Sequence, residues 1–274
     1  MPLRKIDLPA ESTGQAQQSI QQDLDRPTAI QIYEQVSLNA RRELARSNVS
    51  LALSALVGGL TMGLTALGVS IATAMLGQSP AAHFTAFLFY PLGFMAVILG
   101  RSQLFTENTL YPVALILTER RHVLSTLRLW GVVFCANVVG AFLFATLCAR
   151  TSALEPRVFA TMAQFGIDAA SLPVMHIFWS GVVGGWIIAM VAWLVSGSHS
   201  ITGSVALIWS LTFVVGLGHF AHCIATSGEI LAAVLSHQLP AFAYLRWLLP
   251  ATCGNIAGGV LLVTLLEYGQ AKLD

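Results

Sequence analysis

The sequence GRSQLFTEN, at residues 100–108, interrupts an apolar run that extends from residue 84 to residue 118. A second polar and glycine-containing stretch, GLGHFAHC at residues 216–223, lies in the same way inside an apolar run over 201–235. A hydrocarbon core about 30 Å thick is crossed by ~20 apolar residues of helix, so each run is too long for one simple span. Both runs are therefore predicted to be broken helices.

Four further apolar segments of spanning length accompany the two broken ones, at residues 49–76, 127–149, 174–195 and 247–266. Only 10% of the residues are charged, against roughly 25% in an average soluble domain. The composition therefore predicts an all-α integral membrane protein with six transmembrane helices, which form a pore domain over 48–268. A formal net charge of +1 indicates no basic surface for nucleic acid.

A short internal repeat divides the chain into two halves. CANVVGA at residues 135–141 resembles CGNIAGG at residues 253–259. Each copy follows a broken helix at a similar distance, 31 residues from Thr106 to the first asparagine and 36 from His219 to the second. Halves of three spans each must have opposite orientations in the membrane, as in transporters that bind solute between broken helices. An inverted 3+3 repeat is therefore expected.

The repeat also marks candidate structural residues in the third and sixth helices. Its small residues would let helix backbones approach closely. The residues that we assign to this structural role are Asn137, Asn255, Gly140 and Gly258.

The N-terminal part of the chain differs from the rest in being polar. Residues 1–29 lack the apolar core of a cleaved signal peptide and are expected to form a disordered cytoplasmic N-terminus. Residues 30–47 are expected to form an amphipathic helix on the cytoplasmic surface, and the alternative is an ordinary solvated helix. This interpretation rests on an apolar residue at every fourth position, namely Ile32, Val36, Ala40 and Leu44.

The distribution of Lys and Arg predicts the orientation. If the N-terminus is cytoplasmic, ten Lys and Arg residues lie on the cytoplasmic side and three on the other. Cytoplasmic loops carry the excess of positive residues, so both termini, including the tail at 269–274, are predicted to be cytoplasmic.

The two breaks are the candidate solute site, because irregular backbone at membrane depth is tolerated only in protein or against a wet cavity. The N-termini of half-helices favour an anion there. Thr106 is expected to face the solute, while capping alone would explain Glu107 and its two successors. His219 is the candidate proton-exchanging residue, since a histidine at mid-membrane is costly and titrates near neutral pH.

Metal and enzyme alternatives have weaker support in the sequence. His219 and His222 form an H-x-x-H pair, but no third ligand follows at a recognised spacing. Cys223 and Ser227 lie near His219 without any nucleophile signature. We therefore expect no metal, no cofactor and no enzymatic activity. A structural role is favoured for Arg101 and Glu107, by pairing with each other or by extension of one side chain to the interface.

Four motifs, in this order and spacing, are similar to those of the formate/nitrite transporter family. They are YPLGF at 90–94, LFT at 104–106, the histidine at 219 within a family G-x-E-H element, and GNIAGG at 254–259. The resemblance covers nearly the whole span region and is greatest to the YfdC-type branch of bacterial inner-membrane proteins.

The resemblance implies an aquaporin-like fold and a homopentamer with one pore in each protomer of the bacterial inner membrane. It implies an outer constriction and an inner one around a central histidine that exchanges protons with a weak-acid anion. The implied pathway residues are His219 and Thr106 at the centre, Tyr90 and Phe94 on the outer side, and Leu104 on the inner side. Phe105, which follows Leu104, is a further candidate pathway residue.

The chain also departs from the family pattern. Gly218 replaces the glutamate before the histidine, Cys223 replaces an asparagine, and no Lys or Arg occurs over 158–180, where the family has an entrance lysine. The expected function is a channel or proton-coupled transporter for a small monovalent anion or its neutral acid. Two alternatives stay open: a pore for a small neutral solute, and a non-transporting member with a structural or regulatory role.

Overall fold

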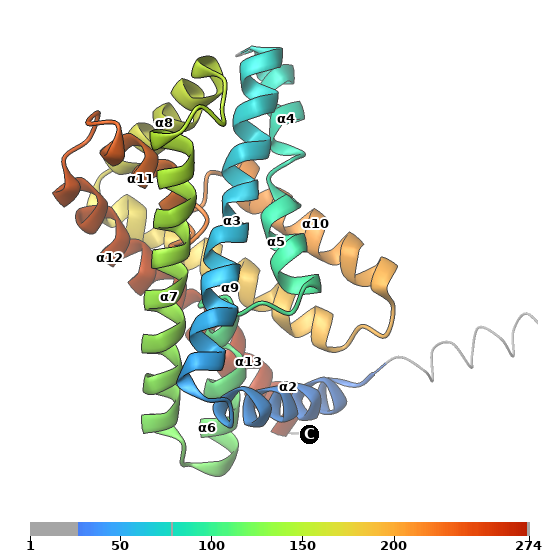
Figure 1. Cartoon of the computed structure of the whole chain (residues 1–274). Helices are drawn as coiled ribbons and strands as arrows, with labels where there is room; N and C mark the ends of the chain where they lie inside the picture. The colour runs from blue at the N-terminus through green and yellow to red at the C-terminus, as the bar shows by residue number, and fades with distance from the viewer. Residues whose placement is uncertain (1–26, 78, 273–274) are drawn as a thin grey trace, which may run out of the picture.

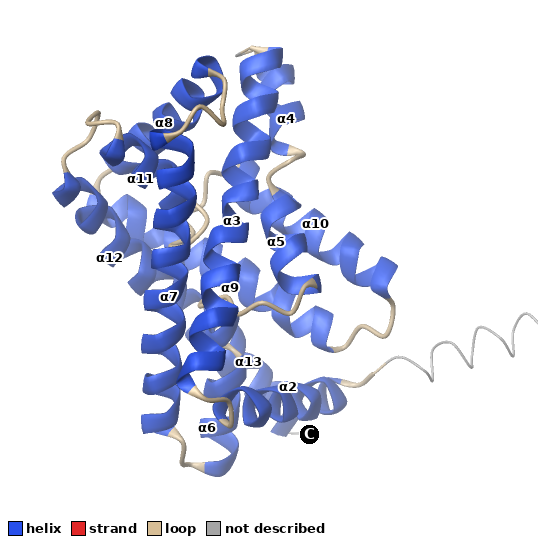
Figure 2. Ribbon diagram, in the orientation of Figure 1, coloured by secondary structure: helices blue, strands red, loops and turns tan. Residues whose placement is uncertain are grey.

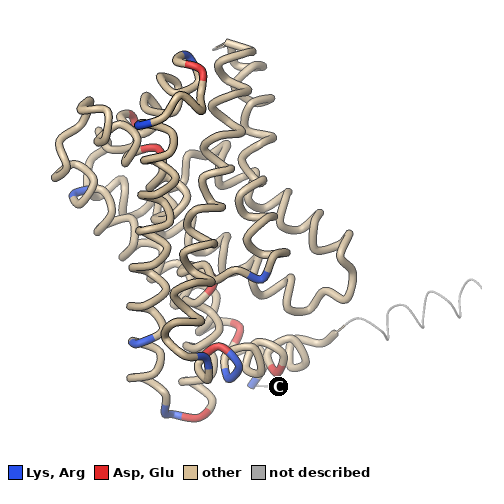
Figure 3. The backbone as a smooth tube through the Cα atoms, viewed as in Figure 1, with Lys and Arg blue, Asp and Glu red and all other residues tan. Residues whose placement is uncertain are grey.

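The computed structural model of the chain describes residues 27–77 and 79–272, and every regular element in these ranges is a helix (Figures 1 and 2). Of the predicted polar segment 1–29, only the last three residues are described, so its predicted disorder lies outside the described residues. The helices form an elongated bundle, and charged residues gather mainly at its two ends (Figure 3).

Each half of the bundle contains two long helices and one broken span. The long helices of the first half are α3 (Asn48–Leu76) and α7 (Val123–Arg150). Its broken span consists of α4 (Pro80–Phe87), α5 (Pro91–Leu99), η1 (Glu107–Thr109) and α6 (Tyr111–Glu119). The second half comprises α9 (Val174–Ser196), the broken span of α10 (Ile201–Leu217) and α11 (Ser227–Leu235), and the chain of α12 (Ala241–Ala257), η2 (Gly258–Thr264) and α13 (Leu265–Lys272).

Two other helices lie outside this repeat: α2 (Ala29–Leu44) precedes the first half, and α8 (Pro156–Ser171) connects the halves. Within the described residues, five helical segments are long and apolar enough to cross a membrane, and α10, with 17 residues, is the shorter sixth. The predicted six-helix membrane fold, with a broken second and fifth span, is confirmed.

Helix starts are encoded locally. The hydroxyls of Ser47, Ser79 and Ser200 each accept a hydrogen bond from the backbone N–H three residues later, at the starts of α3, α4 and α10. Such caps satisfy donors that would otherwise have no partner at the first turn. Proline at the first helical position also begins α4 and α5, where its missing N–H costs no intrahelical bond.

The two halves repeat the same close helix packing. Gly140 of α7 lies against Leu56 of α3, and Gly258 lies against Val182 of α9. A Cβ atom at either glycine would overlap a main-chain carbonyl oxygen of the partner helix. The predicted role of these glycines in close backbone approach therefore fits the packing in both halves.

We expect Gly140→Ala to destabilise the protein by about 1–3 kcal/mol, because the new methyl group must push α7 away from backbone that cannot rotate aside. Gly131→Ala is the matched control, since it lies on the same helix and a Cβ there would meet no atom within 4 Å. Thermal unfolding of the purified proteins in detergent measures the difference. Equal midpoints for the two variants would contradict the packing argument.

The helix α2 lies across one end of the bundle, beside α6 and the C-terminal α13 (Figure 1). Its buried residues are Tyr33, Val36, Ser37 and Ala40. The Tyr33 hydroxyl donates to the Ala114 carbonyl oxygen of α6 at 2.6 Å. The apolar side of α2 is thus covered by protein, and its position on the cytoplasmic surface stays a prediction.

A charged cluster also joins α2 to the end of α6. The Glu119 carboxylate accepts hydrogen bonds from Arg41 of α2 (2.9 Å), from Arg121 (2.7 Å) and from His122 (2.8 Å). These partners, the hydrogen bond of His122 first, lower the pKa of Glu119 to about 2.

A carboxyl whose pKa is lower in the folded than in the unfolded protein stabilises the fold above its unfolded pKa, near 4.5. This contribution decreases as the pH falls from 4.5 toward 2. We expect Glu119→Gln to lower the unfolding midpoint by a few degrees at pH 7 and the difference from wild type to shrink below pH 4.5. Glu34→Gln, on the exposed side of α2, is the control, and a pH-independent difference would argue against this cluster.

Candidate functional site

Both breaks begin with the same type of helix end. Arg101 after α5 and His219 after α10 have left-handed backbone, with φ of 58° and 50°. The next residues, Ser102 and Phe220, each donate a backbone hydrogen bond five residues back, at 3.0 Å. This pattern is the Schellman motif, in which the left-handed position usually holds glycine. His219 is therefore the counterpart of Arg101 and lies at the end of α10.

The two asparagines of the repeat hold the two broken segments. Asn137 Oδ1 accepts from the Phe105 N–H at 2.9 Å, and Asn255 Oδ1 accepts from the Cys223 N–H at 2.9 Å. Each side-chain amide also donates to two carbonyl oxygens, one in its own break and one in the first helix of its half. Both asparagines are fully buried, so water does not compete for any of these hydrogen bonds.

A buried pair connects the two breaks. Thr106 Oγ1 lies 2.8 Å from Nε2 of His222, and both residues are fully buried. The Phe94 and His222 rings pack in a T-shaped arrangement, with centroids 5.0 Å apart. Thr106 was expected to share the centre of the pathway with His219, but its partner is His222, because Phe220 and Ala221 lie between His219 and the point where the breaks meet.

The hydrogen bonds of His222 define its tautomer. Its Nδ1 accepts from the Ala225 backbone N–H at 3.0 Å, so the ring proton of the neutral histidine is on Nε2. Nε2 then donates to Thr106 Oγ1, and the hydroxyl hydrogen of Thr106 is left to donate to a third group. The pair therefore presents one O–H donor at the junction of the breaks.

Aromatic rings follow the first half of the broken span toward this pair. Phe87 and Tyr90 have ring centroids 6.3 Å apart, and Tyr90 and Phe94 have centroids 5.7 Å apart. Phe94 and Leu104 are fully buried. Phe105 packs on Trp130 and Phe134 of α7, so its ring contacts lie within the first half. The pathway roles of Tyr90, Phe94, Leu104 and Phe105 stay predictions.

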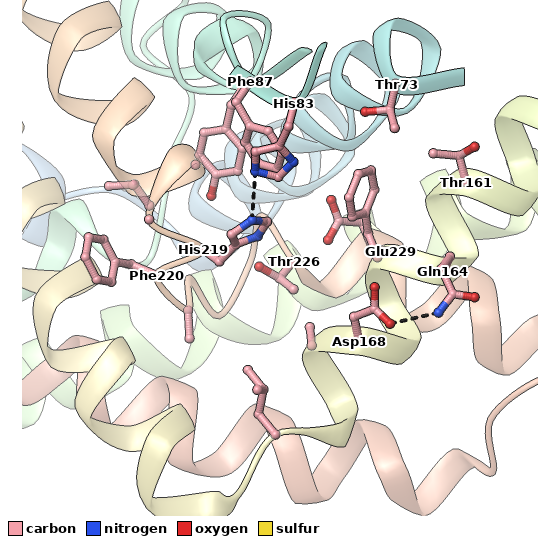
Figure 4. A pocket seen from close by; sticks show the side chains of 18 of the residues that line it. Thr73, His83, Phe87, Thr161, Gln164, Asp168, His219, Phe220, Thr226 and Glu229 are labelled. Atoms are coloured by element: carbon pink, nitrogen blue, oxygen red, sulfur yellow. Dashed lines mark hydrogen bonds between the residues drawn. The ribbon is translucent and has the colours of Figure 1, made fainter. Parts of the chain in front are cut away.

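A cavity of about 820 Å³, called the vestibule below, adjoins the rings of Phe87 and Tyr90 (Figure 4). Helices α4, α8 and α11 contribute to its lining, and they lie at the end of the bundle opposite α2 (Figure 1). The loop after α10 brings His219 to its wall, where the side chain lies beside His83 of α4 and not at the centre of the molecule. Besides these two histidines, the acidic, basic and histidine side chains that line the vestibule are Arg157, Asp168, His176 and Glu229.

The vestibule changes one sequence-based inference. The stretch 158–180 contains no Lys or Arg, yet Arg157, one residue earlier, lines the cavity from the start of α8. The wall of the vestibule therefore does hold a cation, together with the acidic side chains of Asp168 and Glu229. Gln164 donates to Asp168 at 2.7 Å, while no hydrogen bond of the Glu229 side chain occurs within the described residues.

The remaining candidate groups have structural contacts. Ser227 Oγ donates to the Cys223 carbonyl oxygen at 2.6 Å and lies 2.9 Å from the Tyr244 hydroxyl, so it is engaged within the second half. Within the described residues, no group of three or more His, Cys, Asp or Glu side chains could hold a metal ion. Arg101 and Glu107 form no ion pair with each other, in contrast to one of the two sequence interpretations.

The family model for the formate/nitrite transporter matches residues 30–269, which is most of the chain. The chain belongs to the formate/nitrite transporter family. It is similar to the inner membrane protein YfdC of Escherichia coli (strain K12), with 28% identity over 249 residues that cover 90% of this chain and 80% of that protein. It also resembles the uncharacterized transporter YwcJ of Bacillus subtilis (strain 168), with 24% identity and coverage of 88% and 96%.

Two solved structures share the family fold. An FNT family ion channel superimposes with a TM-score of 0.77 and 17% identity, over 87% of this chain and 98% of that chain. A pentameric formate channel with formate bound superimposes with a TM-score of 0.70 and 17% identity, over 83% and 98%. At this identity the likeness shows the fold, and the predicted aquaporin-like membrane architecture agrees with it.

Sequence reasoning missed His222 as the partner of Thr106, although the repeat contained the signal. In the structure, 32 residues separate each asparagine from the residue whose N–H it accepts, and 34 separate it from the break carbonyl that it contacts. The distance of 31 residues from Thr106 to Asn137, counted back from Asn255, ends at Ile224, which is two residues from His222 and five from His219. Equal spacing in the two halves was the observation that could have found it.

Proposed function

We propose that this member of the formate/nitrite transporter family is a channel for a small monovalent anion that crosses as its neutral acid. The observation that carries the proposal is the buried Thr106–His222 pair, which bridges the two breaks beside the fully buried Phe94. In this proposal, His222 takes the central position expected for His219. Phe94 closes the pathway on the vestibule side and Leu104 on the other side.

The charge state of the pair supports a neutral solute at the narrowest point. A bare anion would leave water at high cost to pass between Phe94 and Leu104. The Thr106 hydroxyl can donate a hydrogen bond to a carbonyl-type oxygen of the solute. Nδ1 of His222 accepts from Ala225, so the neutral ring carries its only N–H proton on Nε2. Loss of this proton to the solute would leave an imidazolate, which is too basic to persist in contact with water at neutral pH. The proton therefore travels with the solute, and transport is electroneutral.

The vestibule supports this sequence of events. Arg157 can attract the anion, and the Asp168 carboxylate in the same wall keeps the cavity from holding anions tightly. The solute takes a proton from water in the vestibule, crosses as the acid, and releases the proton on the other side. This role makes the protein a transporter without a chemical step of its own, and not an enzyme.

Location and assembly complete the proposal. The bias of Lys and Arg supports cytoplasmic termini. In this orientation α2 lies on the cytoplasmic side of the bacterial inner membrane and the vestibule on the opposite side. The similarity to YfdC, described as an inner membrane protein, and to a pentameric formate channel supports this membrane and a homopentamer with one pathway in each protomer.

The test is uptake by proteoliposomes of formate, nitrite, acetate and hydrosulfide between pH 5 and 8, with glycerol as the neutral solute. We expect uptake to rise as the pH falls, in proportion to the neutral acid, without any membrane current. Uptake of glycerol that does not vary with pH would instead support the pore for a neutral solute. Intact oligomers without uptake of any solute would support the structural or regulatory alternative.

A further inference from the structure

Two histidines from different halves of the repeat meet at the vestibule. His83 lies on α4 and His219 follows α10, and their Nε2 atoms are 3.3 Å apart (Figure 4). The ring centroids are 5.2 Å apart, with 34° between the ring planes. Both side chains line the 820 Å³ cavity, so solvent reaches the space beside the two nitrogens.

We propose that His83 and His219 form a two-histidine binding site for a divalent transition-metal ion such as Zn²⁺ at the vestibule. Two histidine nitrogens at about 2.0–2.1 Å from a tetrahedral ion lie about 3.3 Å from each other, which is the observed separation. As a direct hydrogen bond the contact is long, because N–H···O bonds usually measure about 2.7–3.2 Å. The pair is thus spaced for an ion between the rings.

The surroundings hold both rings near this geometry. His219 has a left-handed backbone that is fixed by the helix end of α10, and its backbone N–H donates to the Gly216 carbonyl oxygen at 2.9 Å. Phe87 and His219 form a T-shaped pair with ring centroids 4.9 Å apart, and the centroid of Phe87 lies 4.6 Å from that of His83. One aromatic side chain therefore supports both ligands, and little rearrangement is needed to bind an ion.

The ligand set defines the kind of ion. Two neutral imidazoles favour Zn²⁺, Ni²⁺ or Cu²⁺ over Mg²⁺ or Ca²⁺, which prefer oxygen ligands. Within the described residues, no third His, Cys, Asp or Glu completes the group, so water or solute oxygens would occupy the other positions. Binding should consequently be reversible and easily removed by a chelator.

The experiment is calorimetric titration of Zn²⁺ into the purified oligomer after removal of any histidine tag, at pH 7.5. The variants are His83→Gln, which suits a helix, and His219→Asn, because asparagine tolerates the left-handed backbone. His176→Asn is the matched control, since His176 lines the same vestibule outside the pair. We expect wild type and His176→Asn to bind one Zn²⁺ per protomer, and each pair variant to bind at least tenfold more weakly.

Two results would overturn the proposal: saturable binding that His83→Gln and His219→Asn leave unchanged, or an equal loss in His176→Asn. The thermal unfolding midpoint of each variant without metal shows whether it is folded. A second measurement rests on the proposed function. Zn²⁺ on the vestibule side should inhibit uptake by wild type more than by His83→Gln. Calorimetry needs no transported solute, so failure of the site and failure of the proposed function are distinguishable.

Discussion

Replacing His222 with asparagine is expected to lower uptake about ten- to a hundredfold. The substitution removes the Nε2 donor to Thr106 in a fully buried position. Loss of one buried hydrogen-bond partner costs about 1–3 kcal/mol, and each 1.4 kcal/mol in a barrier changes a rate about tenfold. Initial uptake rates of the best solute in proteoliposomes, at equal protein content, measure the effect.

His219→Asn is the control for this prediction. It keeps the left-handed helix end and changes only a side chain at the vestibule wall, so its uptake should stay within about twofold of wild type. Size-exclusion chromatography shows whether both variants assemble. A large loss in His219→Asn with normal uptake in His222→Asn would restore the assignment made from the sequence and contradict the one made from the structure.

Replacing Asn255 with aspartate is expected to destabilise the protein by about 2–6 kcal/mol. The carboxylate can still accept from Cys223, but it cannot donate to the carbonyl oxygens of Gly181 and Ala221. Each carbonyl left without its buried donor costs about 1–3 kcal/mol. The unfolding midpoint in detergent and the yield of intact oligomer measure the loss.

Asn137→Asp should have a similar effect, because Asn137 makes the equivalent three bonds in the first half. Asn39→Asp on α2 is the control, since Asn39 only accepts, from Gln35 at 3.1 Å, and aspartate can do the same. If Asn137→Asp and Asn255→Asp unfold like Asn39→Asp, the asparagines do not hold the breaks.

The spans and the repeat could be predicted from the sequence because burial in lipid imposes strong constraints on composition. The positions of Asn137 and Asn255 were visible for the same reason, since a buried amide in an apolar helix is costly without partners. The contact of Thr106 could not be predicted from residue type, because His219 and His222 are chemically equal. Only the register of the loop after α10 decides which of the two reaches the first break.

The helix α8 was not predicted, although its pattern was present. Its buried residues follow a helical spacing at Val158, Met162, Gly166 and Ala170, but the segment lies between spans and is too polar to stand out in a search for membrane helices. The consequence was that the vestibule, to which α8 contributes Arg157 and Asp168, had no place in the sequence-based site.

The hydrogen bonds of Asn137 and Asn255 also affect how the opening of the proposed solute pathway should depend on temperature. Each break is tied to the helices of its own half, so a large backbone rearrangement would have to break buried hydrogen bonds in both halves. Rotation of Phe94 and Leu104 needs no such loss, and rotamer changes in less crowded side chains occur within picoseconds to nanoseconds, against microseconds to milliseconds for domain movements. A passage that opens by such rotation should have a low activation enthalpy, so cooling should slow solute passage only weakly.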